Sequence, residues 1–132
     1  EPFLTASALT AVLAQPLARK LCVSCAEEYR PSDAELRAPR VPDHDFEQYL
    51  SLTLRRATGC PRCSNTGYKG RVGIFQLLRM NEGLESLVAT RASRDVLEAA
   101  GYENGMRSLW SDGLEKVKSG VTSVEELASV LV

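Results

Sequence analysis

Apolar positions recur with helical spacing at the start of the 132-residue chain. Apolar residues three or four positions apart share one face of a helix, so this pattern predicts an N-terminal helix. The residues concerned are Leu4, Ala8, Leu9, Val12 and Leu13. A proline at position 16 cannot donate a backbone N–H and is expected to end the helix near residue 15.

Two predicted strands lie next to cysteine pairs. Residues 17–21 alternate between apolar and polar side chains and run directly into Cys22. Residues 72–79 are rich in the β-branched and aromatic types that favour strands. We expect these two strands to pair antiparallel, which would bring the two cysteine pairs together.

The segment between the cysteine pairs is predicted to be helical at both ends. Ser32 and Glu35 form a capping-box pattern that predicts a short helix. An apolar stripe predicts a longer helix that ends at Gly59. The stripe consists of Phe46, Tyr49, Leu50, Thr53, Leu54 and Ala57. His44 lies in a polar, proline-flanked stretch and is interpreted as a solvated loop residue.

The last third of the chain is predicted to be helical. Short helices follow the capping residues Asn81 and Ser93, and a third helix stops at Gly120. Residues 122–125 form a capping box before the last helix. The apolar stripes are interpreted as core, and the acidic pair at 125 and 126 as cap and solvent face.

Composition indicates an ordinary globular chain. With 44% hydrophobic and 25% charged residues, the chain fits one domain or two small lobes sharing a core. It has no apolar run of membrane-spanning length and no basic region typical of a signal peptide, so we interpret it as cytosolic. The helical start predicts that Glu1 is a cut inside a larger protein. The net charge of −1 gives no overall attraction to nucleic acid, although residues 55–80 contain six Lys/Arg and no acidic residue.

The four cysteines are the most specific chemical signal. Two C-x-x-C pairs separated by 34 residues supply four thiolates, which suits a tetrahedral zinc ion. The predicted ligands are Cys22, Cys25, Cys60 and Cys63. Because four sulfur ligands leave no open position, the predicted role is structural, with one Zn²⁺ per chain.

Residues around the second pair fit the same interpretation. Gly59, Gly67 and Gly70 allow the backbone to turn back toward sulfur. Asn65 and Thr66 are candidates for hydrogen bonds that orient the ligands. Four nearby cations would offset the charge of the thiolates: Lys20, Arg62, Lys69 and Arg71.

Alternative roles for the cysteines are two disulfides, a redox function for the Cys60–Cys63 motif, or no metal at all. Other catalytic chemistry is not indicated. The chain lacks the phosphate-binding pattern G-x-x-x-x-G-K-[ST], and no catalytic set can be built around its single histidine. No catalytic or cofactor-binding residue is therefore predicted.

The motifs resemble the C-terminal region of the type II secretion and type IV pilus assembly ATPase family. The resemblance begins with Leu9-Thr10-Ala11-Val12-Leu13-Ala14-Gln15 and is most specific in Gly59-Cys60-x-x-Cys63-x-x-Thr66-Gly67-Tyr68-Lys69-Gly70-Arg71. It continues in Gly105-Met106-Arg107-Ser108-Leu109 and in residues 120–127. One departure is Pro16, where the family commonly has an arginine.

The resemblance implies a place in a motor. Family members are hexameric cytoplasmic ATPases that drive pilus or pseudopilus assembly, and their four-cysteine subdomain binds zinc. Their ATP and Mg²⁺ sites would lie upstream in the parent protein, so only the four cysteines transfer as functional residues. The implied partners are the rest of the ATPase, neighbouring subunits and an inner-membrane platform protein, with no nucleic acid. The implied location is cytoplasmic, at the inner membrane through those partners.

The predicted fold class is α+β, mostly helical, with a short antiparallel strand pair at a zinc knuckle and a small C-terminal helical bundle. Predicted boundaries are 1–21 for the end of the ATPase core, 22–71 for the zinc subdomain and 72–132 for a strand and helices. Two alternatives stay open. One is a zinc-ribbon-like module that binds nucleic acid through the basic segment. The other is a chaperone-like zinc repeat, suggested by the residues from Cys60 to Tyr68.

Overall fold

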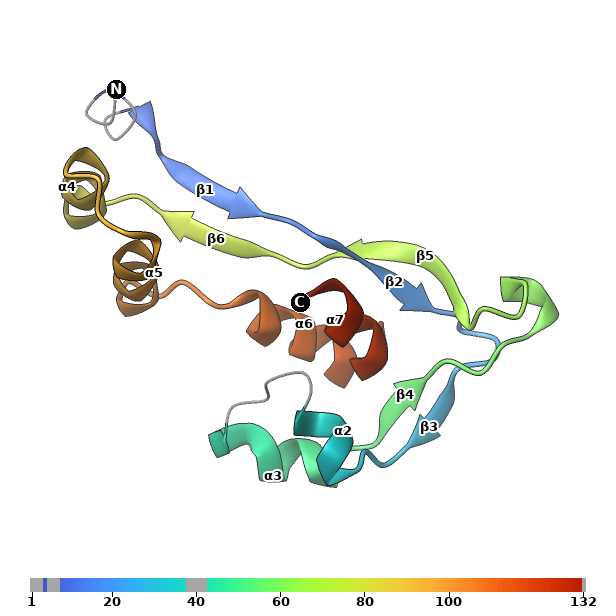
Figure 1. The fold of residues 1–132 in the computed structure, drawn as a ribbon. Coiled ribbons are helices and arrows are strands. Elements are labelled where there is room, and N and C mark those ends of the chain that lie inside the picture. The colour runs from blue at the N-terminus through green and yellow to red at the C-terminus, as the bar shows by residue number, and fades with distance from the viewer. Residues whose placement is uncertain (1–3, 5–7, 38–42, 132) are drawn as a thin grey trace. The chain divides into compact units, whose positions relative to one another are not determined.

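The computed structural model describes residue 4, residues 8–37 and residues 43–131 (Figure 1). Leu4 and Ala8 are helical, as predicted for the N-terminal helix, and residues 5–7 lie outside the described part. The α+β class is confirmed, since helices and short antiparallel strand pairs occur together. The chain divides into two compact units. Unit 1 comprises Glu1–Ala14 and Phe75–Ser108, and unit 2 comprises Gln15–Ile74 and Leu109–Val132.

Unit 1 contains a two-stranded ribbon. Strand β1 (Ala11–Ala14) pairs antiparallel with β6 (Gln76–Arg79). The predicted helix is therefore wrong for residues 11–14. The ribbon places Val12 directly opposite Leu78, and this cross-strand pairing outweighs the local helical pattern.

Helices α4 (Glu82–Ala89) and α5 (Arg94–Glu103) complete unit 1. Both predicted caps are confirmed. Asn81 accepts a hydrogen bond from the backbone N–H of residue 84 at 2.8 Å, and Ser93 accepts one from residue 96 at 3.3 Å. Each cap satisfies a backbone donor that the first helical turn cannot satisfy itself.

Unit 2 is built on a second ribbon, formed by β2 (Leu17–Leu21) and β5 (Tyr68–Gly73). The predicted strand at 17–21 is confirmed, and so is its antiparallel partner for residues 72 and 73. Residues 76–79 instead belong to β6 in unit 1.

A third ribbon in unit 2 joins β3 (Glu27–Tyr29) and β4 (Leu54–Arg56). The predicted helix over 46–57 is therefore wrong beyond α3 (Asp43–Ser51). In this ribbon residues 27 and 28 lie opposite residues 56 and 55, so acidic side chains face basic ones across the strands. Leu54 is buried, which adds a packing reason for the strand.

The short helix α2 (Asp33–Arg37) confirms one half of the predicted capping box, because the Ser32 hydroxyl accepts from the Glu35 N–H at 3.2 Å. The Glu35 carboxylate instead accepts a hydrogen bond from the Tyr29 hydroxyl. The loop interpretation of His44 is wrong for its backbone, which lies in α3. The apolar residues at 46, 49 and 50 share one face of that helix.

Helix α7 (Val124–Val130) packs on β2, and α6 (Leu109–Lys118) packs on α7 and on β4. Gly113 allows the two helices to approach closely, since a Cβ there would lie 2.3 Å from a methyl group of Leu127. The N-cap of α7 is Ser123, one residue later than the predicted box. All ten residues of the buried core cluster lie in unit 2: Ala18, Leu36, Tyr49, Leu54, Ile74, Leu114, Val117, Val124, Leu127 and Leu131.

Among the described residues, no helix has both the length and the apolar character needed to cross a bilayer.

Candidate metal centre

The four cysteines come from the turns that link the two ribbons of unit 2. Cys22 follows β2 directly, and the turn to Cys25 leads into β3. Cys60 follows β4, and Cys63 closes the single 3₁₀ turn η1 (Pro61–Cys63). Each pair is therefore fixed at the end of an antiparallel ribbon, as the pairing of the predicted strands required.

The sulfur geometry fits a tetrahedral metal site. All four Sγ atoms lie within 4.8 Å of one another. Three of the sulfur pairs are 3.8 Å apart: Cys22 with Cys60, Cys25 with Cys63, and Cys60 with Cys63. A tetrahedron with Zn–S bonds of about 2.3 Å has S–S edges of about 3.8 Å. The cysteines are thus placed to hold one metal ion of this size.

The same distances decide against the disulfide alternative for this structure. All four cysteines are free, and the short sulfur pairs are 3.8 Å apart, whereas a disulfide bond is about 2.05 Å long. The redox alternative also finds little support, because a reactive low-pKa thiol is usually accessible, whereas Cys63 is only 6% exposed.

The second cysteine pair is held by close backbone packing. Gly59, with φ of +114°, lies so near the carbonyl of residue 65 that a Cβ would approach its oxygen to 2.9 Å. Gly67, with φ of +84°, would place a Cβ 2.4 Å from the Cβ of Ala57. Both positions need a left-handed backbone and no side chain, which is the role predicted for these glycines.

Backbone donors prepare the Cys63 sulfur as a ligand. The N–H groups of Cys60 and Gly67 donate to its Sγ at 3.3 and 3.1 Å. Burial opposes ionisation, but these two hydrogen bonds outweigh it and lower the pKa of the Cys63 thiol to about 6. Burial raises the pKa of the Cys60 thiol to about 11.

Two threonines stabilise the cysteine turns through hydrogen bonds to their backbone. Thr58 donates its hydroxyl to the carbonyl oxygen of Cys25 at 2.5 Å, which ties the second turn to the first. The Thr58 hydroxyl, together with the Gly59 N–H, also lowers the pKa of the Cys25 thiol. The Thr66 hydroxyl donates to the Cys63 carbonyl at 2.8 Å, not to a sulfur. Thr66 therefore forms a hydrogen bond at the cysteine turn, as predicted, but to the backbone of Cys63. The contribution of Thr58 was not predicted.

The four cations predicted to offset the thiolate charge are all exposed: Lys20, Arg62, Lys69 and Arg71. Within the described part of the chain, none of them donates a hydrogen bond to a cysteine sulfur. Their influence on the metal site is thus limited to longer-range charge.

An ion pair between a buried carboxylate, Glu126, and a half-exposed arginine of the β2–β5 ribbon, Arg19, was not predicted from the sequence. Glu126, interpreted from the sequence as solvent-facing, is only 4% exposed. It accepts the backbone N–H of Arg19 at 2.7 Å and the guanidinium at 2.8 and 2.9 Å. Burial alone would raise the pKa of the Glu126 carboxyl, but these bonds outweigh it and hold the pKa below its ordinary value. Its position three residues after the Ser123 cap was the available signal.

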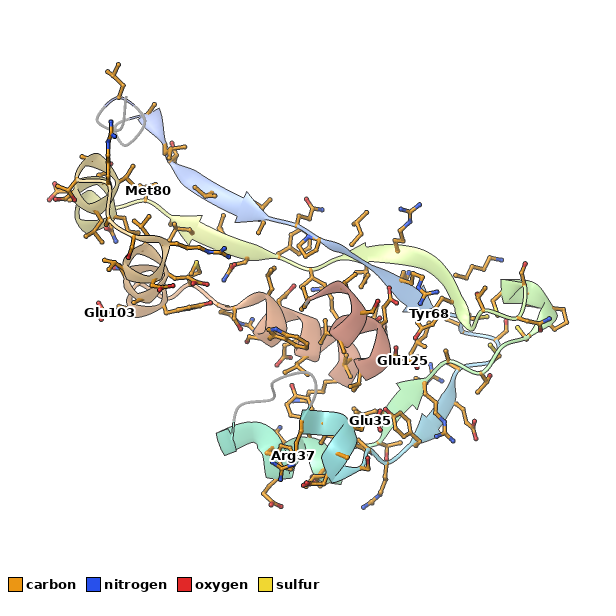
Figure 2. All side chains as sticks on the ribbon, in the orientation of Figure 1. Glu35, Arg37, Tyr68, Met80, Glu103 and Glu125 are labelled. Carbon is orange, nitrogen blue, oxygen red and sulfur yellow. The ribbon has the colours of Figure 1, made fainter. Side chains whose placement is uncertain are left out.

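Further contacts tie α7 to the same ribbon. The Arg19 guanidinium lies 4.1 Å from the centre of the Tyr68 ring, and the Tyr68 hydroxyl is 2.6 Å from the Ser123 hydroxyl. Thr122 donates to the Arg19 carbonyl at 2.7 Å. Figure 2 shows Tyr68 where the β2–β5 ribbon approaches the cysteine turns, with Glu125 of α7 nearby. The last helix is therefore anchored to the strand that leads into Cys22.

Comparison with known proteins finds relatives that align with nearly the whole of this chain. The type II secretion system ATPase E of Vibrio cholerae is 42% identical over 130 residues, and the type II secretion system protein E of Pseudomonas aeruginosa is 38% identical over 130 residues. The type IV pilus assembly ATPase PilB of Thermus thermophilus is 35% identical over 128 residues. These alignments cover 98%, 98% and 96% of this chain, but only 25%, 25% and 14% of the relatives.

This chain thus spans about a quarter or less of the length of these relatives. A family model described as type II/IV secretion system protein matches residues 1–129, in agreement with the resemblance carried by the cysteine and glycine motifs. The chain therefore belongs to the type II/IV secretion system protein family.

Proposed function

We propose that this chain is the zinc-binding portion of a motor ATPase for type II secretion or type IV pilus assembly. The observation that carries the proposal is the cluster of four cysteine sulfurs within 4.8 Å, formed by two C-x-x-C turns. Zinc is the ion that this all-sulfur tetrahedral set suits best. One ion would bind per chain, and its role would be structural.

The zinc ion would join the two ribbons of unit 2. Without it, each cysteine turn ends a short two-stranded ribbon, and such ribbons are marginally stable alone. Structural zinc can supply on the order of 10 kcal/mol to folding. In our proposal the site therefore acts as a rigid clamp in the motor, within the predicted zinc subdomain at residues 22–71.

The family match and the names of the relatives support the motor assignment. ATP and Mg²⁺ would be bound by the remaining part of a longer parent protein, which would assemble as a cytoplasmic hexamer. Residues 1–21 would end its ATPase core, and residues 72–132 would carry a strand and helices. The clamp would contact neighbouring subunits or an inner-membrane platform protein.

Arg62 is the best probe of a partner contact. It is exposed in the 3₁₀ turn between two cysteines. Arg56, also in the basic segment, is a poorer probe because it stacks 5.0 Å from the Tyr29 ring and pairs with Glu27 at 3.7 Å. Reversing its charge would disturb the β3–β4 ribbon itself.

The test uses the full-length motor carrying Arg62→Glu in cells that depend on it for secretion or piliation. We expect reduced secretion or piliation with an intact zinc content. Lys118→Glu is the matched control, since Lys118 is an exposed cation of α6 with the same charge change. Equal transport by Arg62→Glu and the control would remove the contact proposal, and a motor fully active with the cysteines replaced would remove the clamp.

The nucleic-acid alternative gains no support from Tyr68, the aromatic residue beside the cysteine turns. A stacking platform needs open aromatic faces, and the Tyr68 ring is already stacked by the Arg19 guanidinium at 4.1 Å.

A further inference from the structure

A small polar cavity lies beside the β2–β5 ribbon, outside the cysteine cluster. Its volume is about 350 Å³, near the lower end of the range for small-molecule sites. It is lined by three cations, two hydroxyl-bearing side chains and one glycine: Arg19, Lys69, Arg71, Thr66, Tyr68 and Gly70. No acidic residue lines the cavity.

Two arginines face each other across the ribbon at this cavity. Arg19 and Arg71 are direct cross-strand partners. The Arg19 N–H is bound by Glu126 and its carbonyl by Thr122, so its backbone bonds point away from β5. The two arginines therefore form a non-hydrogen-bonded pair, the type in which opposing side chains lie closest. Like charges placed directly opposite destabilise a ribbon unless an anion lies between them.

The available anion satisfies only one of the two arginines. Glu126 pairs with Arg19 through both carboxylate oxygens. Within the described part of the chain, the side chains of Arg71 and Lys69 have no hydrogen bond or ion pair. Three cations thus line the cavity, and the one carboxylate that offsets them, Glu126, binds Arg19 from outside the lining.

We infer that this cavity is a binding site for a phosphate group. An excess of two positive charges matches a phosphate dianion, and the Arg71 guanidinium, which has no partner within the described part of the chain, can bind two phosphate oxygens. The Lys69 ammonium, also at the lining of the cavity, supplies a further positive charge. The phosphate could belong to a free phosphate compound or to a phospholipid headgroup, which share this chemistry.

The test uses the zinc-loaded chain and follows its backbone and arginine side-chain N–H signals by NMR. One arm titrates sodium pyrophosphate against sodium chloride of equal ionic strength. The other arm adds vesicles of phosphatidylglycerol in phosphatidylcholine, compared with phosphatidylcholine alone. If the bound phosphate belongs to a free compound, we expect pyrophosphate to cause saturable shifts of the N–H signals at residues 69–71. If it belongs to a phospholipid headgroup, we expect these shifts only with the anionic vesicles.

The variants separate phosphate binding from general charge. Arg71→Ala should weaken binding about tenfold or more, since charge-assisted hydrogen bonds are lost, and Arg71→Lys should bind at an intermediate level. Arg79→Ala is the matched control, because it removes an exposed arginine of β6. Arg71 is exposed and unpartnered in the described part of the chain, so its variants are expected to fold.

Two results would overturn the inference. The first is the absence of saturable shifts at residues 69–71 in both arms. The second is unchanged pyrophosphate and vesicle binding in Arg71→Ala together with easier zinc loss to a chelator. That pattern would mean that these cations balance the charge of the cysteine thiolates instead of binding phosphate.

Discussion

The two compact units differ in what stabilises them. Unit 2 contains every residue of the buried core cluster, the four-cysteine site and the Arg19–Glu126 pair. In unit 1, Leu84 is the one fully buried apolar side chain among the described residues, whereas Val12, Leu13 and Leu77 are 41–54% exposed. Unit 1 depends mainly on helix caps and a short ribbon.

The difference between the units predicts which substitutions should lower the stability of the protein most. Removing a buried group leaves a cavity or an unpaired polar atom, and these are the main causes of large losses in stability. Surface and cap changes act locally and cost less. We therefore expect the free energy of unfolding to be far more sensitive to changes in unit 2 than in unit 1.

The largest effect is expected from Cys63→Ser. It removes the ligand whose thiol pKa is lowered to about 6, and a hydroxyl is a poor substitute for a thiolate. We expect loss of the bound metal and of most tertiary order in unit 2, measured by metal content and near-UV circular dichroism. Ser24→Ala, an exposed residue between two cysteines, should change neither. Retained metal and unchanged spectra in Cys63→Ser would contradict the difference between the units.

Matched glycine substitutions compare the packing of the units directly. Gly113→Ala places a Cβ 2.3 Å from buried Leu127 and should cost about 1–3 kcal/mol. Gly101→Ala meets only side-chain ends, the Met106 methyl at 2.9 Å and a Leu78 methyl at 3.0 Å, and alanine favours the helix, so the cost should be smaller. Urea unfolding measures both. Equal losses would show that unit 1 is packed as tightly as unit 2.

Glu126→Gln should cost about 1–2 kcal/mol at neutral pH, because it weakens a buried carboxylate's bonds to a half-exposed arginine. A double-mutant cycle with Arg19→Ala measures the coupling between the two side chains. Additive losses in that cycle would show that the pair contributes nothing of its own.

The free energy of unfolding that Glu126 contributes should depend on pH. Arg19 holds the pKa of Glu126 below its unfolded value of about 4.3, so the ionised form is favoured by folding. The advantage over Glu126→Gln should be complete above about pH 5 and should shrink as the pH falls through the lowered folded pKa. Urea unfolding of both proteins at each pH checks this. A difference that grows on acidification would contradict it.

The smallest effect is expected at a cap in unit 1. Ser93→Ala removes the exposed cap of α5 and should cost about 0.5–1 kcal/mol. Ser123→Ala removes a buried cap that also contacts the Tyr68 hydroxyl, so its cost should be larger. Hydrogen exchange at the first turn of each helix, together with urea unfolding, compares the two. A reversed order would count against the difference between the units.

The sequence predicted the fold well where contacts between residues close in the chain determine the structure. Asn81, Ser93 and the box at Ser32 mark helix starts because each cap is a contact between residues close in the chain. The cysteine spacing likewise predicted which side chains meet. The helix caps depend only on contacts within a few residues, and the cysteine cluster follows from four side chains that together suit one metal ion.

Long-range pairing could not be predicted in the same way. Residues 11–14 and 54–56 have helical apolar spacing, but they form strands because residues distant in sequence pair with them. Glu126 appeared exposed because its partner, Arg19, is 107 positions away. These contacts depend on the assembled ribbons, and no pattern within one segment reports them.

The central claim is that the four cysteines bind one structural zinc ion. Native mass spectrometry of the chain, before and after treatment with a strong chelator, tests it most directly when circular dichroism is recorded on the same samples. We predict one zinc per chain and a loss of structure when the zinc is removed. A chain that contains no zinc, or that keeps its structure after losing it, would contradict the claim.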